Sequence, residues 1–163
     1  MGKNKVNIIA EPGKQDILIT REFEAPRELV FKAFTDKKLL ERWMKHRDLE
    51  TKFIEFEAKN GASWRFVQSD PRGNKYEFHG VIHEILPSER IIQTFEFDGL
   101  PEKGHVALET TKFEELPDER TRITTLSVFQ SVEDRDGMVQ SGMEVGVQGN
   151  YSNLDEILQE LNQ

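Results

Sequence analysis

The segment from Ser141 to Leu161 constrains the fold more than any other stretch, because it alone is long and periodic enough to predict a long helix. Its apolar residues recur at spacings of three and four, which places them on one stripe of that helix. They are Met143, Val147, Tyr151, Leu154, Leu158 and Leu161. Such a stripe has to pack against another surface, so we expect the rest of the chain to supply one.

The chain before this helix mainly predicts strands. Asp16 to Glu24 alternates apolar and polar residues, as a half-buried strand does. Later candidates are separated by turn signals rich in Gly, Pro, Asn and Asp. They are Lys52–Ala58, Ser63–Ser69, Lys75–Leu86, Ile91–Phe97, Gly104–Glu115 and Thr121–Gln130. Short turns between strands favour an antiparallel arrangement.

Two short helices are expected between the first strand and the second. Pro26 suits the first position of a helix, and Thr35 or Asp36 suits the cap of the next one. The inward residues of the two helices are Leu29, Val30, Ala33 and Phe34, then Leu39, Leu40 and Trp43. The sequence therefore predicts an α+β fold: a strongly curved antiparallel sheet of about seven strands, two short helices after the first strand, and a long C-terminal helix over the concave face.

Residues 1–15 admit two interpretations. Val6 to Ala10 is a short apolar run closed by Pro12 and Gly13, which fits either a frayed tail or an extra edge strand. Residues 16–163 are expected to form a single domain, since a chain of 163 residues can bury a hydrophobic core without disulfides or bound metals to stabilise it.

Composition removes several function classes. There is no Cys, so neither a disulfide framework nor a thiolate site is expected. A net charge of −8 argues against nucleic acid, because the one basic cluster is interleaved with acids. That cluster is Lys37, Lys38, Arg42, Lys45, His46 and Arg47. No membrane span or signal peptide is predicted, and a cytoplasmic location is the default expectation.

Three glycines in the expected final helix, Gly142, Gly146 and Gly149, each cost roughly 1 kcal/mol relative to Ala in a helix interior. Their spacing places them on a common face. One interpretation is close packing of helix backbone on the sheet. The other is a void between helix and sheet that could hold an apolar ligand.

Aromatic residues mark where the sheet should meet the helix. Trp64 and Phe66 share one face of their strand by parity, as do Phe95 and Phe97. The candidate ligand-binding residues are Trp43, Trp64, Phe66, Phe78, Phe95, Phe97, Phe129, Met143, Val147 and Tyr151. Ordinary core packing is the alternative interpretation for each of them. Tyr151 should also need a hydrogen-bond partner, because its hydroxyl lies on an apolar helix face.

No catalytic, metal or cofactor site is predicted. Glu77, His79 and His83 share a strand face, but next-but-one positions on a strand are about 7 Å apart, which spreads the three too far for one ion. His46 and His105 could act as general bases only if they lined the interior. The motifs of nucleophilic serine enzymes, phosphate-binding loops and dinucleotide sites do not occur.

Several stretches resemble the activator of heat-shock-protein-90 ATPase homologue family. They are residues 19–31 with Thr35-Asp36 and 40–43, then 61–66, 78–84, 87–91, 141–147 and 154–158, so the resemblance covers about residues 16 to 161. The sequence departs from the family pattern at two places. After Trp43 it has Met44, Lys45 and His46, where the family often has a second Trp and a Gly-Pro. It has Gly61-Ala62 where the family often has paired glycines.

The resemblance implies the helix-grip fold of the START-related, polyketide-cyclase-like superfamily, with a cavity between the sheet and the long helix. An apolar or amphipathic small molecule is the partner that this cavity implies. A cyclase- or hydrolase-like enzyme that uses His105 or Tyr151 is an alternative, and a chaperone-associated interaction domain is a second one. Both departures fall near the expected pocket mouth, so no relative's ligand is carried over.

Overall fold

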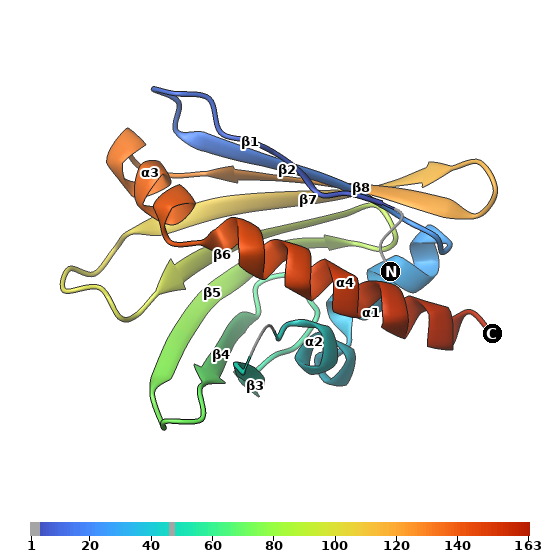
Figure 1. Cartoon of the computed structure of the whole chain (residues 1–163), viewed down its shortest axis with the longest axis horizontal. Helices are drawn as coiled ribbons and strands as arrows, with labels where there is room; N and C mark the ends of the chain where they lie inside the picture. The colour runs from blue at the N-terminus through green and yellow to red at the C-terminus, as the bar shows by residue number, and fades with distance from the viewer. Residues whose placement is uncertain (1–3, 46–47) are drawn as a thin grey trace.

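The computed structural model describes residues 4–45 and 48–163 (Figure 1). In chain order the elements are β1 (Asn7–Ile9), β2 (Asp16–Phe23), α1 (Arg27–Thr35), α2 (Lys37–Trp43), β3 (Glu50–Glu55), β4 (Ser63–Ser69), β5 (Lys75–Leu86), β6 (Arg90–Phe97), β7 (Val106–Leu116), β8 (Arg120–Val128), α3 (Val132–Gln140) and α4 (Met143–Leu161).

The strands form one antiparallel sheet in the order β1-β2-β8-β7-β6-β5-β4-β3. The sheet curves, and α4 runs across its concave face (Figure 1). This arrangement confirms the predicted helix-grip architecture. The described part of the sheet has eight strands instead of about seven, because β1 pairs with β2 from Asn7 opposite Thr20 to Ile9 opposite Leu18.

Local sequence explains the first elements. Alternate residues of β2 are buried, from Ile17 to Phe23, so one face of this strand belongs to the core. Pro26 occupies the N-cap of α1, one position before the expected place. Asp36 caps α2, where its carboxylate accepts hydrogen bonds from the backbone N–H groups of Lys38 at 3.0 Å and Leu39 at 3.1 Å.

The region between β8 and α4 differs from the expectation. Residues from Val132 to Gln140 form the additional helix α3, capped by the Ser131 hydroxyl, which accepts from the Asp134 N–H at 3.0 Å. Gly142 has a φ of 86°, so it joins α3 to α4 in a left-handed conformation that favours glycine. The prediction that Gly142 lies inside the final helix was therefore wrong, and α4 begins at Met143.

Some strands also end at residues other than the predicted ones. β3 covers Glu50–Glu55 where Lys52–Ala58 was predicted, and β8 ends at Val128 instead of Gln130. In β5, a Cβ added to Gly80 would lie 2.0 Å from the carbonyl oxygen of Thr94, so only glycine permits this approach to β6. The β5–β6 pairing then shifts register between Ile82 and Glu84. A bulge of this kind bends a sheet.

The two halves of α4 pack differently. Its second half carries the buried residues Tyr151, Leu154, Ile157 and Leu158, whereas no residue from 143 to 150 is buried. The second half is also anchored to α2 and the segment after it, because Asn153 Nδ2 donates to the Lys45 carbonyl at 2.6 Å and Arg42 pairs with Glu160 at 3.0 Å. The first half of α4 is thus the loosely packed part of this helix. Within the described ranges, none of the helices is long and apolar enough to cross a membrane.

Candidate functional site

An aromatic wall covers the inner face of β3 to β6. We use this name for Phe53, Phe56, Trp64, Phe66, Phe78, Phe95 and Phe97. Trp64 stacks on Phe66 with ring centroids 5.5 Å apart, and Phe66 stacks on Phe78 at 4.9 Å. Phe78 continues to Phe97 at 5.0 Å. The strands therefore present a continuous aromatic surface, as the parity of the two predicted pairs indicated.

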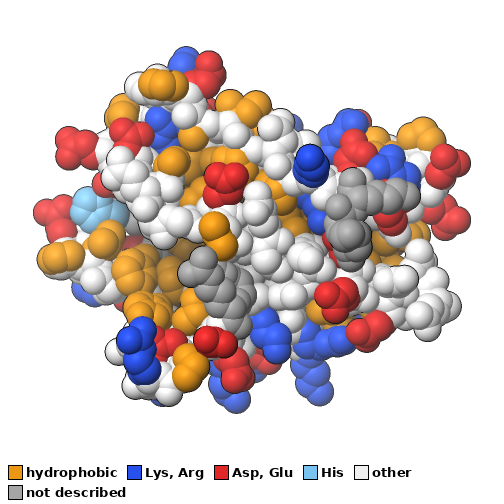
Figure 2. All heavy atoms as spheres, viewed as in Figure 1, with side chains coloured by type: hydrophobic (Ala, Val, Ile, Leu, Met, Phe, Trp, Pro, Cys, Tyr) orange, Lys and Arg blue, Asp and Glu red, His pale blue; other side chains and the backbone are white. Residues whose placement is uncertain are grey.

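Burial decreases along this wall. Trp64 and Phe66 are buried, whereas Phe78, Phe95 and Phe97 are half-buried. Figure 2 shows hydrophobic side chains gathered in a hollow beside α4. Large aromatic side chains that stay partly accessible on an inner sheet face provide surface that a ligand can cover.

The first half of α4 contributes Met143 and Val147, two of the predicted site residues. Both are half-buried and pack against the edge of the core. The region bounded by this half-helix and the aromatic wall is the candidate site. Gly146 and Gly149 lie in the same half of the helix and add no side chain to it.

A polar row crosses β6 to β8 beside the aromatic wall. We use this name for Gln93 of β6, Glu109 of β7 and Ser127 of β8, which are direct cross-strand neighbours. The amide of Gln93 donates to the Glu109 carboxylate at 3.3 Å, and the Ser127 hydroxyl donates to it at 3.5 Å. Both bonds are long for hydrogen bonds to a carboxylate.

Glu109 is the unusual member of the polar row. Its residue surface is half-buried, but protein surrounds the carboxyl group closely enough that burial raises its pKa. The bonds from Gln93 and Ser127 oppose this rise only in part, and no described cation contributes to it. An interior carboxyl group without a cationic partner costs free energy in its charged form.

Tyr151 brings a hydroxyl from α4 to the same side of the sheet. The phenol hydrogen-bonds to Thr125, whose hydroxyl in turn lies 3.0 Å from that of Thr111. Burial raises the pKa of Tyr151, and the nearby charge of Glu109 raises it further. The phenol therefore stays protonated at neutral pH. Its hydrogen bond to Thr125 satisfies the expectation that Tyr151 needs a partner.

The ten predicted site residues do not form one group. Trp43 and Tyr151 belong to a second aromatic cluster with Phe23 and Phe34, and the Trp43 indole N–H donates to the Ala33 carbonyl at 2.8 Å. Phe129 follows β8 and is buried. Trp64, in contrast, lies in the aromatic wall, and its buried indole nitrogen has no hydrogen-bond partner among the residues that the structure describes. The remaining predicted residues lie in the aromatic wall or in the first half of α4.

The polar candidates from the sequence lie elsewhere. His79 is on the outer face, where it pairs with Asp98 at 2.7 Å. Its neighbour Arg65 pairs with the same carboxylate at 2.6 Å. His105 pairs with Asp134 of α3 at 3.0 Å. His46 lies outside the described residues. Among the residues that are described, no group of three or more His, Cys, Asp or Glu side chains could hold a metal ion.

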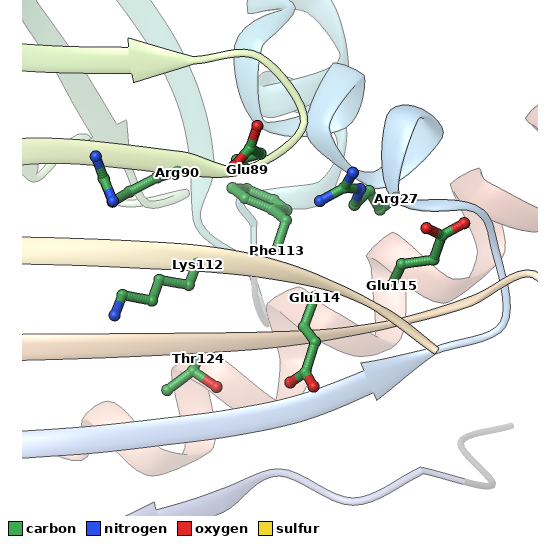
Figure 3. Close-up of a pocket in the computed structure, with 8 residues that line it drawn as sticks. All are labelled: Arg27, Glu89, Arg90, Lys112, Phe113, Glu114, Glu115 and Thr124. Atoms are coloured by element: carbon green, nitrogen blue, oxygen red, sulfur yellow. The ribbon is translucent and has the colours of Figure 1, made fainter. Parts of the chain in front are cut away.

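A separate surface hollow of about 480 Å³ lies where α1 begins, beside the ends of β6 to β8 (Figure 3). Its lining residues are Arg27, Glu89, Arg90, Lys112, Phe113, Glu114, Glu115 and Thr124. Charges of both signs surround it and Phe113 is its one aromatic residue, so it lacks the apolar surface of the candidate site.

Comparisons with known proteins agree with this architecture. The sequence profile described as Activator of Hsp90 ATPase homolog 1-like protein matches residues 24–159. A crystal structure from Rhodobacter sphaeroides is similar with a TM-score of 0.85 and 24% identity, covering 96% of this chain and 99% of that one. A solution structure from Arthrobacter aurescens has a TM-score of 0.84 and 26% identity, with coverage of 94% and 91%. A Mycobacterium smegmatis protein reaches 0.84 at 19% identity, with coverage of 94% and 97%. No curated protein matches the sequence.

Proposed function

This chain belongs to the Activator of Hsp90 ATPase homolog 1-like protein family, and from that premise we propose that it is a small-molecule binding protein. The ligand is apolar or amphipathic and lies between the aromatic wall and the first half of α4. Catalysis forms no part of this proposal. An interaction of the kind that the family description names, with an Hsp90 ATPase, is the alternative function, and it would require a protein-binding surface instead of an interior site.

The observation that carries the proposal is the contrast between the two halves of α4. The second half buries four residues, whereas the first half, with Met143 and Val147 on its inner stripe, buries none. The half-buried rings of Phe78, Phe95 and Phe97 lie on the wall of the same site. A helix that leaves aromatic surface uncovered on the sheet below it supports a ligand that completes the packing.

A tryptophan in place of Val147 tests this proposal. The larger side chain should fill the space between α4 and the aromatic wall, so an uncharged apolar probe, N-phenyl-1-naphthylamine, should bind at least about tenfold more weakly. Fluorescence titration measures the affinity, and circular dichroism verifies that the variant is folded.

Val145→Trp is the matched control. Val145 lies two positions earlier on the same helix, but it is 46% exposed, so a tryptophan there should extend into solvent. Its probe affinity should stay within about twofold of the wild type, a difference of less than 0.5 kcal/mol. Equal affinities for Val147→Trp and the wild type would contradict a ligand site beneath the first half of α4.

A further inference from the structure

We propose that the ligand class is a hydrophobic amine, whose ammonium group pairs with Glu109 while its apolar body lies on the aromatic wall. This inference rests on the proposed function and adds the chemistry that the site recognises. Three observations carry it. They are the Glu109 carboxyl group, which has no described ion-pair partner, the aromatic rings beside it, and the ion pair that already occupies Arg21.

The first observation is the isolation of Glu109. Its carboxylate has only the long hydrogen bonds from Gln93 and Ser127, and no described Lys, Arg or His forms an ion pair with it. A carboxylate accepts about four hydrogen bonds when fully satisfied, so capacity remains for a donor from a ligand. A ligand ammonium group would supply both the missing charge and the missing donors.

The second observation is the position of the aromatic rings. Phe95 pairs with Ala107 and Gln93 with Glu109, so Phe95 and Glu109 are diagonal neighbours on adjacent strands. Such neighbours lie about 7–8 Å apart, within the span of a small organic cation and its first carbons. Phe95 in turn contacts Trp64 at 5.9 Å and Phe78 at 5.5 Å. Aromatic faces beside a carboxylate attract an organic cation through their quadrupoles.

The third observation argues against an anionic ligand. Arg21 is the inner-face cation of β2, and both of its terminal nitrogens donate to Asp155 of α4 at 2.6 Å. Its guanidinium group also lies 4.6 Å from the ring centre of Phe23, so Arg21 makes a cation–π contact in the core as well. A ligand carboxylate would therefore meet the Glu109 carboxyl group with no free cation beside it among the described residues 4–45 and 48–163. The net charge of −8 likewise favours a cationic ligand.

Three probes that share one aromatic body separate charge from shape. They are 1-naphthylmethylamine, 1-naphthalenemethanol and 1-naphthoic acid, measured against the wild-type chain by isothermal titration calorimetry at neutral pH. The amine should bind at least about tenfold more tightly than the alcohol, and the acid more weakly than both, because only the amine carries a positive charge that can form an ion pair with the Glu109 carboxylate. This comparison requires no variant.

Glu109→Gln then identifies the residue responsible. The amide keeps the size of the side chain and one acceptor oxygen but removes the charge, so the preference for the amine over the alcohol should disappear while alcohol affinity changes by less than about threefold. Glu114→Gln is the matched control, since Glu114 is on the same strand, has a side chain 60% exposed, and pairs with Arg122 on the outer face. It should retain the full preference.

The outcomes distinguish the two proposals. An amine preference that Glu109→Gln abolishes and Glu114→Gln keeps supports the inference. An alcohol that binds as tightly as the amine, or a preference that survives in Glu109→Gln, overturns the amine class and leaves the binding site standing. Failure of all three naphthalenes and of N-phenyl-1-naphthylamine to bind overturns the proposed function, and the inference with it.

Discussion

Arg21 links β2 directly to α4. Its side chain is only 4% exposed and forms a two-pronged ion pair with Asp155. Asp155→Asn would leave the guanidinium charge buried without its counter-ion, so the free energy of unfolding should fall by about 3 kcal/mol. Urea unfolding at neutral pH measures this change.

The exposed ion pair between Arg42 and Glu160 gives the control for that measurement. Both of its side chains are largely in solvent, so Glu160→Gln should change the free energy of unfolding by no more than about 0.5 kcal/mol. If the two variants were equally destabilised, the Arg21–Asp155 pair would not be the main link between helix and sheet.

Glu109 shows the limit of prediction from sequence for single residues. The aromatic wall was predictable because strand parity places Trp64 with Phe66 and Phe95 with Phe97. One acid in a mixed polar strand carries no such signal. Its only mark is that it shares parity with Ala107 and Phe113, both of which are buried. Recognising it as interior requires knowing that β6 and β8 flank β7 and that the sheet curves around it.

Among the elements, α3 is the one that a change of pH should affect. His105, in the segment between β6 and β7, lies 3.0 Å from Asp134 of α3 and 2.8 Å from Glu102. The hydrogen bond with Asp134, followed by the one with Glu102, raises the pKa of His105 above its ordinary value. A raised pKa in the folded state means that the protonated form stabilises the fold.

This contribution is complete below the ordinary histidine pKa of about 6.5 and is lost as the pH rises through the raised pKa of the folded state. The wild type should therefore be more stable than His105→Gln at pH 6, and this stability difference should be smaller at pH 9. At pH 9 His105 is neutral in both the folded and the unfolded state, so the charge no longer contributes. Thermal unfolding across this range measures the difference. His83, an exposed residue of β5, provides the control, and His83→Gln should follow the wild-type pH profile. A constant gap between wild type and His105→Gln would contradict the role of the ion pair.

The same helix explains why the element prediction was incomplete. β2 to β8 and α4 have strong apolar periodicity, so their existence followed from the sequence, although several observed ends differ from the predicted ones by a few residues. For β1, the sequence left a frayed tail and an edge strand as alternatives. α3 is mostly polar and is held by Arg135, which is buried and donates to the backbone carbonyls of Glu11 and Asp16 at 2.8 and 3.0 Å. Contacts with distant backbone leave no periodic pattern. The one local signal was Ser131 followed three residues later by Asp134, which is typical of a helix start.

At the scale of the whole molecule, the two ends of α4 differ in packing, and we propose that only the first half covers a ligand. The second half packs with α1 and α2 and is anchored through Tyr151 and Asp155, whereas the first half covers the candidate site and carries Gly146 and Gly149. Regions with few buried contacts open more readily than the core. Amide hydrogens from 146 to 150 should therefore exchange at least about tenfold faster than those from 154 to 158, as hydrogen-exchange mass spectrometry or NMR can measure.

Binding should reverse this contrast, because a ligand that fills the site supplies the apolar contacts that the first half of α4 lacks. Saturating 1-naphthylmethylamine should slow exchange from 146 to 150 and in the half-buried part of β6 around Phe95, while exchange from 154 to 158 stays the same. A ligand that bound on the outer face would instead protect β5 near His79 and leave α4 unchanged. Protection confined to that face would contradict an interior site, whereas protection of the first half of α4 would show that the loosely packed half of the helix closes over the ligand.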